Sequence, residues 1–150
     1  MVERFDDIAG MRTNDPSGVL EQLMAFPDQL EWARGLSVPC LPTVDNVVLC
    51  GIGGSAIAGD VIVDLISSGC SVPVQTVRNI RLPGFADRDT LAIIVSYSGN
   101  TVESLDLYGD ATSRGCHIVT ITSGGELERL ARNDSRPLIK MPANNQPRAS

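Results

Sequence analysis

The chain has 150 residues, enough for one domain of ordinary size and too few for two. Its residues are 43% hydrophobic and 20% charged, which excludes a disordered chain, and no apolar run approaches the roughly 20 residues of a membrane-spanning helix. Twelve basic against eighteen acidic residues give a net charge of −6, the wrong sign for a general nucleic-acid binder.

At the N-terminus, charged residues are not followed by an apolar stretch, so we expect no signal peptide and a cytoplasmic protein. No internal repeat, charge block or Ser/Pro-rich linker divides the sequence. We expect residues 1–35 to form a helical segment that packs on a domain formed by residues 36–150.

Two short helices are predicted in the N-terminal segment. Asp15 is typical of a helix N-cap, because Pro16 follows it at the first helical position. Pro27 interrupts the apolar pattern of that helix. A second helix is predicted to run from Pro27 to Arg34, with Gly35 as its C-cap.

Five short apolar runs follow, without the polar alternation of a half-exposed strand, as expected of strands buried on both faces of a parallel sheet. In one of the helical stretches between them, Val102, Leu105 and Tyr108 recur at a spacing of three and predict a buried stripe. The alternation predicts a three-layer α/β/α sandwich with a five-stranded parallel sheet. The predicted strands are residues 46–50, 72–77, 91–95, 117–121 and 137–141, the predicted helices are 56–67, 101–113 and 125–132, and 78–90 is predicted to be a loop.

Two loops rich in glycine and hydroxyl residues follow predicted strands. Gly51 to Ser55 follows the first strand, and Ser96 to Thr101 follows the third. If the strand order is 2-1-3-4-5, the first and third strands are neighbours, and both loops open into one crevice at the carboxyl ends of the strands.

Such a crevice suits an anion. Glycine lets the backbone approach a ligand closely, and each loop leads into a helix whose free N–H groups and dipole favour negative charge. Hydroxyl groups add neutral donors, so the combination fits a phosphate monoester without lysine side chains. The plainer interpretation is that both loops are ordinary strand-to-helix turns with capping serines.

The first loop also admits a dinucleotide interpretation. Gly51, Gly53 and Ala56 match the G-x-G-x-x-G/A fingerprint, which expects an acidic residue about 20 positions further on. The second strand instead ends near Arg78, which could meet a 2′-phosphate. An NADP-binding domain therefore stays open as an alternative.

Cysteine and histidine residues predict no metal site. Cys40, Cys50, Cys70 and Cys116 lie far apart and form no C-x-x-C pair, and His117 is a single histidine at the start of an apolar strand. We expect reduced, mostly buried thiols and a structural histidine.

The two loops together resemble a known family. The stretch from Gly51 to Ala56 with Gly59-Asp60, and the stretch from Ser96 to Ser104, are similar to the first sugar-isomerase (SIS) domain of the bifunctional phosphoglucose/phosphomannose isomerases. The similarity covers nearly the whole chain. The resemblance implies that Arg148 stabilises the negative charge of an enediolate, that no cofactor or metal takes part, and that a hexose 6-phosphate is held at Gly53, Gly54, Ser55, Ser96, Ser98 and Thr101.

The chain departs from the family in its acid/base groups. The resemblance implies that the glutamate base and the ring-opening histidine come from a second SIS domain, and that a lysine comes from near the C-terminus. This chain stops at Ser150, before any of them. His117, Glu103 and Asp60 are poor substitutes, because their positions suit structural, helix-capping or solvated roles.

The resemblance leads to a divided prediction. We expect the intact protein to interconvert glucose 6-phosphate or mannose 6-phosphate with fructose 6-phosphate through a cis-enediol, and to form homodimers through SIS-domain pairing. We expect this chain alone to bind the phosphosugar weakly and to isomerise it negligibly. A phosphosugar-sensing regulatory SIS module is a second alternative, beside the NADP-binding domain.

Overall fold

The structure, a computed structural model, describes residues 7–143. It divides into two compact units, one whose described part ends at Val38 and one that runs from Pro39 to Ala143. The sequence-based boundary lies between residues 35 and 36. Arg148, the proposed enediolate-stabilising residue, lies outside the described residues.

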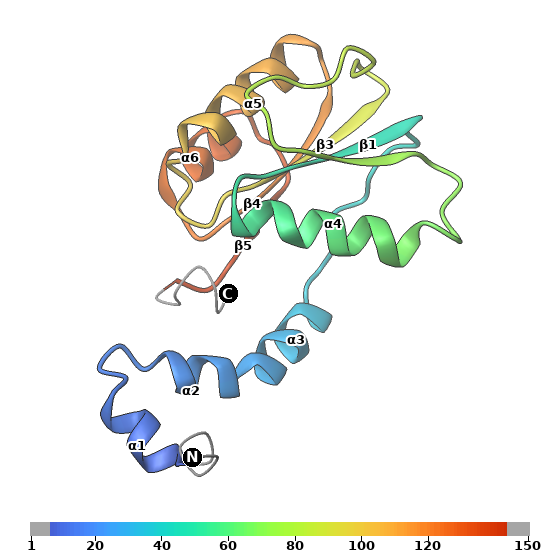
Figure 1. Cartoon of the computed structure of the whole chain (residues 1–150). Coiled ribbons are helices and arrows are strands. Elements are labelled where there is room, and N and C mark those ends of the chain that lie inside the picture. The colour runs from blue at the N-terminus through green and yellow to red at the C-terminus, as the bar shows by residue number, and fades with distance from the viewer. Residues whose placement is uncertain (1–6, 144–150) are drawn as a thin grey trace. The chain divides into compact units, whose positions relative to one another are not determined.

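The described part of the first unit contains three short helices (Figure 1): α1 (Ile8–Thr13), α2 (Val19–Met24) and α3 (Phe26–Arg34). Pro27 lies in the first turn of α3 and Gly35 is its C-cap, as predicted. Helix α1 was not predicted, because its six residues carry too few apolar side chains to show a period.

The start of α2 differs from the prediction. The helix begins at Val19, and its N-cap is Gly18 in the left-handed conformation, so Asp15 and Pro16 lie in the preceding turn. The carboxylate of Asp15 still accepts a hydrogen bond from the Leu20 N–H at 2.7 Å. Asp15 is therefore not the N-cap that was predicted, although its carboxylate binds an N–H group of the first helical turn from the preceding turn.

The second unit contains a five-stranded sheet in which all strand pairs are parallel, with the order β2-β1-β3-β4-β5. This is the predicted order. The elements of this unit are β1 (Asn46–Cys50), α4 (Gly54–Ile66), β2 (Val74–Val77), β3 (Thr90–Val95), α5 (Val102–Ser113), β4 (His117–Thr122), α6 (Gly125–Asn133) and β5 (Leu138–Lys140).

The helices cover the sheet on both faces. Helix α4 contacts β1 and β2, whereas α5 and α6 contact each other and the strands β3, β4 and β5. Figure 1 shows α4 on one side of the sheet and α5 and α6 on the other. The predicted three-layer α/β/α architecture is confirmed.

Residues 78–89 contain no helix or strand, as predicted, and they cover part of the sheet in place of a helix. Leu82 and Ala86 of this link are buried in the same core cluster as residues of β1, β3 and α5. The Arg114 side chain donates hydrogen bonds to the carbonyl groups of Leu82 and Pro83, at 3.3 and 2.8 Å. The Asp110 carboxylate accepts the Leu82 N–H at 2.8 Å. The link is therefore held by Asp110 of α5 and by Arg114, the C-cap of this helix.

The buried face of α5 is only partly the predicted one, because Tyr108 is buried as predicted and the other two residues of the stripe are not. Val102 is 67% exposed, and Leu105 is only partly buried. The residues that α5 buries are Ser104, Leu107, Tyr108, Asp110 and Ala111. The polar Ser104 and Asp110 concealed this face from an analysis that looked for apolar residues alone.

Two of the four cysteines are buried, whereas most of them were expected to be buried. All four are free thiols; Cys50 and Cys116 are buried, whereas Cys40 and Cys70 are exposed. His117 is half-buried at the first position of β4. Among the residues that the structure describes, no helix is long and apolar enough to cross a membrane, and no group of three or more His, Cys, Asp or Glu residues could hold a metal ion.

Candidate functional site

The two loops singled out in the sequence leave adjacent strands at the same edge of the sheet. Strands β1 and β3 are paired in register, with Cys50 opposite Ile94. The chain then turns into α4 on one face and α5 on the other. This is the arrangement at which open parallel sheets bind ligands.

The first loop, residues 51–55, brings the backbone of α4 close to the end of β1. A Cβ atom on Gly51 would lie 2.9 Å from the carbonyl carbon of Ser55, so the close approach requires glycine. Gly53 has φ +60° and is the N-cap of α4, which has no side-chain cap. The first N–H groups of α4 therefore have no side-chain acceptor, and Ser55 lies half-buried beside them.

The second loop, residues 96–101, is called the hydroxyl loop below. The buried Ser96 hydroxyl accepts a hydrogen bond from the Gly99 N–H at 3.2 Å and lies 3.1 Å from the Thr101 hydroxyl. Ser98 is exposed, and its hydroxyl accepts the Asn100 N–H at 3.3 Å. Thr101 is the N-cap of α5, yet no side chain caps this helix. The interpretation of these loops as turns with capping serines is therefore not supported at either helix.

A third loop meets the hydroxyl loop and was missed in the sequence. Residues 122–125, here called the anchor loop, connect β4 to α6. The first N–H groups of α6 have acceptors: Glu126 N–H donates to Asn100 Oδ1, and Leu127 N–H donates to the Gly99 carbonyl, both at 2.9 Å. The run Ser123-Gly124-Gly125 directly before a helix was the available signal.

Charged groups near the first loop are paired. Arg78, directly after β2, donates a hydrogen bond to Asp60 of α4. This hydrogen bond lowers the pKa of the Asp60 carboxyl below its ordinary value of 3.8. An NADP site that relied on Arg78 would have to compete with Asp60 for the guanidinium. The carboxylate of Glu103 lies in the first turn of α5, after the hydroxyl loop.

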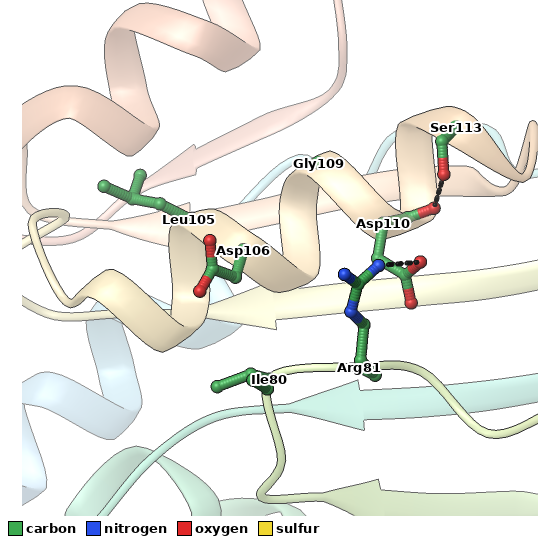
Figure 2. Close-up of a pocket in the computed structure, with 7 residues that line it drawn as sticks. All are labelled: Ile80, Arg81, Leu105, Asp106, Gly109, Asp110 and Ser113. Atoms are coloured by element: carbon green, nitrogen blue, oxygen red, sulfur yellow. Dashed lines mark hydrogen bonds and ion pairs between the residues drawn. The ribbon is translucent and has the colours of Figure 1, made fainter.

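A separate groove lies between the 78–89 link and α5 (Figure 2). Its volume is about 380 Å³, and Figure 2 shows Arg81 reaching across to Asp110, with 3.5 Å between their charged atoms. None of the sequence-predicted site residues lines it. The lining residues are Ile80, Arg81, Leu105, Asp106, Gly109, Asp110 and Ser113.

Comparison with known proteins shows the family of the chain. No protein-family model matches the chain. It is 38% identical to the bifunctional phosphoglucose/phosphomannose isomerase of Caldicellulosiruptor bescii over 137 residues, which are 88% of this chain and 40% of the relative. The chain is a homologue of the bifunctional phosphoglucose/phosphomannose isomerases. It spans about 40% of the length of these isomerases.

The chain is also similar to a further sequence relative and to a solved structure. It is 35% identical over 135 residues to the D-glucosamine-6-phosphate 4-epimerase of Sulfolobus acidocaldarius, covering 88% of this chain and 41% of the relative. Its fold matches the crystal structure of tagatose-6-phosphate ketose/aldose isomerase from Escherichia coli with a TM-score of 0.59, at 24% identity over 86% of this chain and 38% of that chain. The expected SIS-type fold is confirmed.

Proposed function

We propose that this chain is the sugar-phosphate-binding half of an aldose–ketose isomerase. The observation that carries the proposal is the pair of uncapped helix N-termini, those of α4 and α5, which follow adjacent strands of the sheet. The homology to phosphoglucose/phosphomannose isomerases supports a phosphorylated hexose as the ligand.

The phosphate dianion is proposed to lie between the two loops. The free N–H groups at Gly54 and Ser55 begin α4, and those after Thr101 begin α5, so both helix dipoles favour the anion by about 0.3–1 kcal/mol each. The exposed Ser98 hydroxyl and the Thr101 hydroxyl add hydrogen bonds, each worth about 1.5–3 kcal/mol to a charged group. The hydroxyl of Ser96 shapes the loop from inside, and Gly53 leaves room for the sugar.

The proposed reaction interconverts glucose 6-phosphate or mannose 6-phosphate with fructose 6-phosphate through a cis-enediol. Starting from the open-chain aldose, a base removes the proton from C2 while the C1 carbonyl oxygen gains a proton, which gives the cis-enediol. The base then returns a proton to C1 while the O2 hydroxyl loses its proton, which leaves the C2 carbonyl of the ketose. Arg148 is proposed to stabilise the enediolate oxygen, because fixed positive charge where an oxyanion develops lowers the barrier. Neither a metal nor a nucleotide takes part in this scheme.

We propose that the base is supplied by the part of the family's length that this chain does not span. His117 is the first residue of β4, at the opposite end of the strand from the loops, roughly 17 Å away along the backbone. Asp60 is paired with Arg78. Glu103 is the remaining carboxylate close in sequence to the hydroxyl loop, and replacing it by glutamine tests whether it has any part in turnover.

Binding and turnover are tested separately on the 150-residue chain. We expect millimolar-range binding of fructose 6-phosphate in an NMR titration, and no turnover above background in a coupled isomerase assay. The double variant Ser98→Ala, Thr101→Ala should abolish binding, whereas Thr112→Ala, Ser113→Ala, with the same residue types at the other end of α5, should bind like the parent. Equal affinities for the two double variants would remove the hydroxyl loop from the site, and turnover by the parent chain would refute the missing base.

A second candidate reaction is supported by the homology to a D-glucosamine-6-phosphate 4-epimerase. That reaction and the isomerase share a hexose 6-phosphate ligand, so the proposed phosphate site serves both. Titrating the chain with glucosamine 6-phosphate, fructose 6-phosphate and NADPH separates phosphosugar binding, which the two reactions share, from dinucleotide binding. We expect both phosphosugars to bind and NADPH not to bind, whereas tight NADPH binding would favour the dinucleotide interpretation.

The proposal includes a cytoplasmic location and a homodimer formed through SIS-domain pairing. Helix α4 supports the pairing, because a row of apolar side chains lies on its solvent-facing side. Leu65 is 76% exposed, and contiguous exposed apolar surface marks interaction sites. The exposed apolar residues of α4 are Ile57, Val61, Ile62 and Leu65.

A further inference from the structure

The hydroxyl loop is held by the anchor loop through main-chain and side-chain contacts. The Tyr97 carbonyl accepts hydrogen bonds from both the N–H and the hydroxyl of Ser123, at 3.0 and 2.6 Å. Two residues further on, the Gly99 carbonyl accepts the Leu127 N–H. The hydroxyl loop is therefore hydrogen-bonded to the anchor loop at Tyr97 and to the first turn of α6 at Gly99 and Asn100, and it cannot shift without breaking several of these bonds.

Two glycines interlock at the centre of this contact. Gly99 has φ +68°, and a Cβ atom there would lie 1.8 Å from the Gly124 carbonyl oxygen. Gly125 has φ +74°, and a Cβ atom there would lie 2.4 Å from the Ser98 carbonyl oxygen. Any side chain at residue 125 must therefore push the hydroxyl loop at the residue whose exposed hydroxyl is proposed to meet the phosphate.

Thr122, the first residue of the anchor loop, stabilises the conformation of this loop. This residue is fully buried, and its hydroxyl donates to the Gly124 carbonyl at 2.8 Å and accepts the Gly124 N–H at 3.2 Å. The hydroxyl thus closes the turn that presents Gly124 and Gly125 to the hydroxyl loop. Valine has nearly the same shape as threonine but cannot make either hydrogen bond.

We propose that Thr122 and Gly125 are positioning residues of the phosphate site, which set its affinity through the shape of the hydroxyl loop. The inference rests on the proposed function. The contrast among the three helices that begin at this edge of the sheet supports it: the N-termini of α4 and α5 are free for a ligand, whereas that of α6 is occupied by Asn100 and Gly99. Binding groups must be held within fractions of an ångström, so displacing the loop weakens binding without removing a donor.

The first test compares two glycines that share a backbone conformation. Gly125→Ala and Gly115→Ala both place alanine at positive φ, +74° and +73°, but Gly115 lies at the end of α5 with its nearest neighbour, Arg88 Cβ, 3.9 Å away. The probes are inorganic phosphate and fructose 6-phosphate, titrated at a temperature where circular dichroism shows every variant folded. We expect Gly125→Ala to weaken binding of both by at least about tenfold, and Gly115→Ala to change it by less than about twofold. Equal affinities for the two variants would overturn the inference.

A second test avoids steric strain. Thr122→Val should accelerate amide hydrogen exchange at Gly99 and Leu127 and weaken phosphate binding several-fold, whereas Thr122→Ser, which keeps the hydroxyl, should restore both toward the parent values. Unchanged binding with faster exchange would show a structural role alone and overturn the inference. The Ser98→Ala, Thr101→Ala variant keeps the outcomes distinct: if it also binds normally, or if the parent binds neither probe, the proposed function fails and takes the positioning role with it.

Discussion

The hydroxyl oxygens of Ser96 and Thr101 lie 3.1 Å apart and share a hydrogen bond across the hydroxyl loop. Ser96 is buried and also accepts the Gly99 N–H, whereas Ser98, two residues on, is exposed. Two residues of the same type in one short loop thus have different environments: the hydroxyl of Ser96 is buried within the loop, and Ser98 is exposed.

Replacing these two serines by alanine should separate stability from binding. Ser96→Ala removes the buried hydroxyl that accepts the Gly99 N–H and pairs with the Thr101 hydroxyl, while the Ser96 carbonyl still accepts the Gly99 N–H at 3.1 Å. We therefore expect a loss of about 0.5–1.5 kcal/mol of unfolding free energy. Ser98→Ala should cost less than about 0.5 kcal/mol of stability, because the side chain is exposed, but about tenfold or more in phosphate affinity. Urea unfolding and phosphate titration of both variants measure the two quantities. The same pattern of losses in both variants would contradict this division of tasks.

Asp110 should make the stability of the second unit depend on acid pH. Burial alone would raise the pKa of this carboxyl, but the Leu82 N–H and the Arg114 side chain donate to it, and they lower the pKa below its ordinary 3.8. The folded state therefore gains stability above the unfolded pKa and loses it as the pH falls through the lowered value. Asp110→Asn should lose about 1–3 kcal/mol at neutral pH, and its deficit relative to the parent should shrink below about pH 4. Urea unfolding between about pH 2 and pH 7, a range that includes the titration of a carboxyl with a lowered pKa, measures the deficit, and a deficit that does not change with pH would refute the assignment.

The four thiols should react in two classes. Burial raises the pKa of Cys50 to about 12 and also raises the pKa of Cys116, so little thiolate is present at neutral pH. Cys40 and Cys70 are exposed. Titration with a disulfide reagent should therefore modify Cys40 and Cys70 in the native chain, and all four cysteines in denaturant. Peptide mapping identifies the modified residues, and rapid native modification of Cys50 would show that the core opens.

The outer face of α4 can be tested by adding charge. If two copies pair through this face, Leu65→Glu should lower the sedimentation mass of the chain toward that of the monomer, because a carboxylate cannot be buried unpaired in an apolar contact. Phe85→Glu, an equivalent change at an exposed residue of the 78–89 link, is the control and should leave the mass unchanged. Folding of both variants should be preserved. A parent chain that sediments as a monomer would contradict pairing of this chain with itself.

The sheet could be predicted well because its strands are short runs in which apolar residues dominate. The bounds of β1 were predicted to the residue, and those of the other strands to within two. The predicted neighbourhood of β1 and β3 placed the two loops correctly at one edge. The spacing of apolar residues did not identify the whole buried face of α5, because this face includes the polar residues Ser104 and Asp110. The general preference of cysteine for protein interiors overestimated the burial of Cys40 and Cys70.

The candidate site was predicted less completely than the fold. Local sequence indicated which loops carry hydroxyl groups, but not that Ser96 is turned inward to Gly99 or that the anchor loop supports the hydroxyl loop. The inward turn of Ser96 depends on the backbone conformation of its own loop, whereas the support from the anchor loop depends on contacts between residues 26 positions apart, such as Tyr97 and Ser123. A Gly-Gly pair before a helix looks like an ordinary turn until its neighbour across the sheet is known.

The interlocked glycines couple ligand binding to the far half of the sheet. Because the hydroxyl loop is hydrogen-bonded to the first turn of α6, an anion that immobilises Ser98 also immobilises the start of that helix. We therefore expect an anion bound between the loops that follow β1 and β3 to slow the local opening of β4, α6 and β5. Under the proposed function, in which the base lies outside this chain, such a rigid span would present a surface that the bound phosphosugar has already ordered.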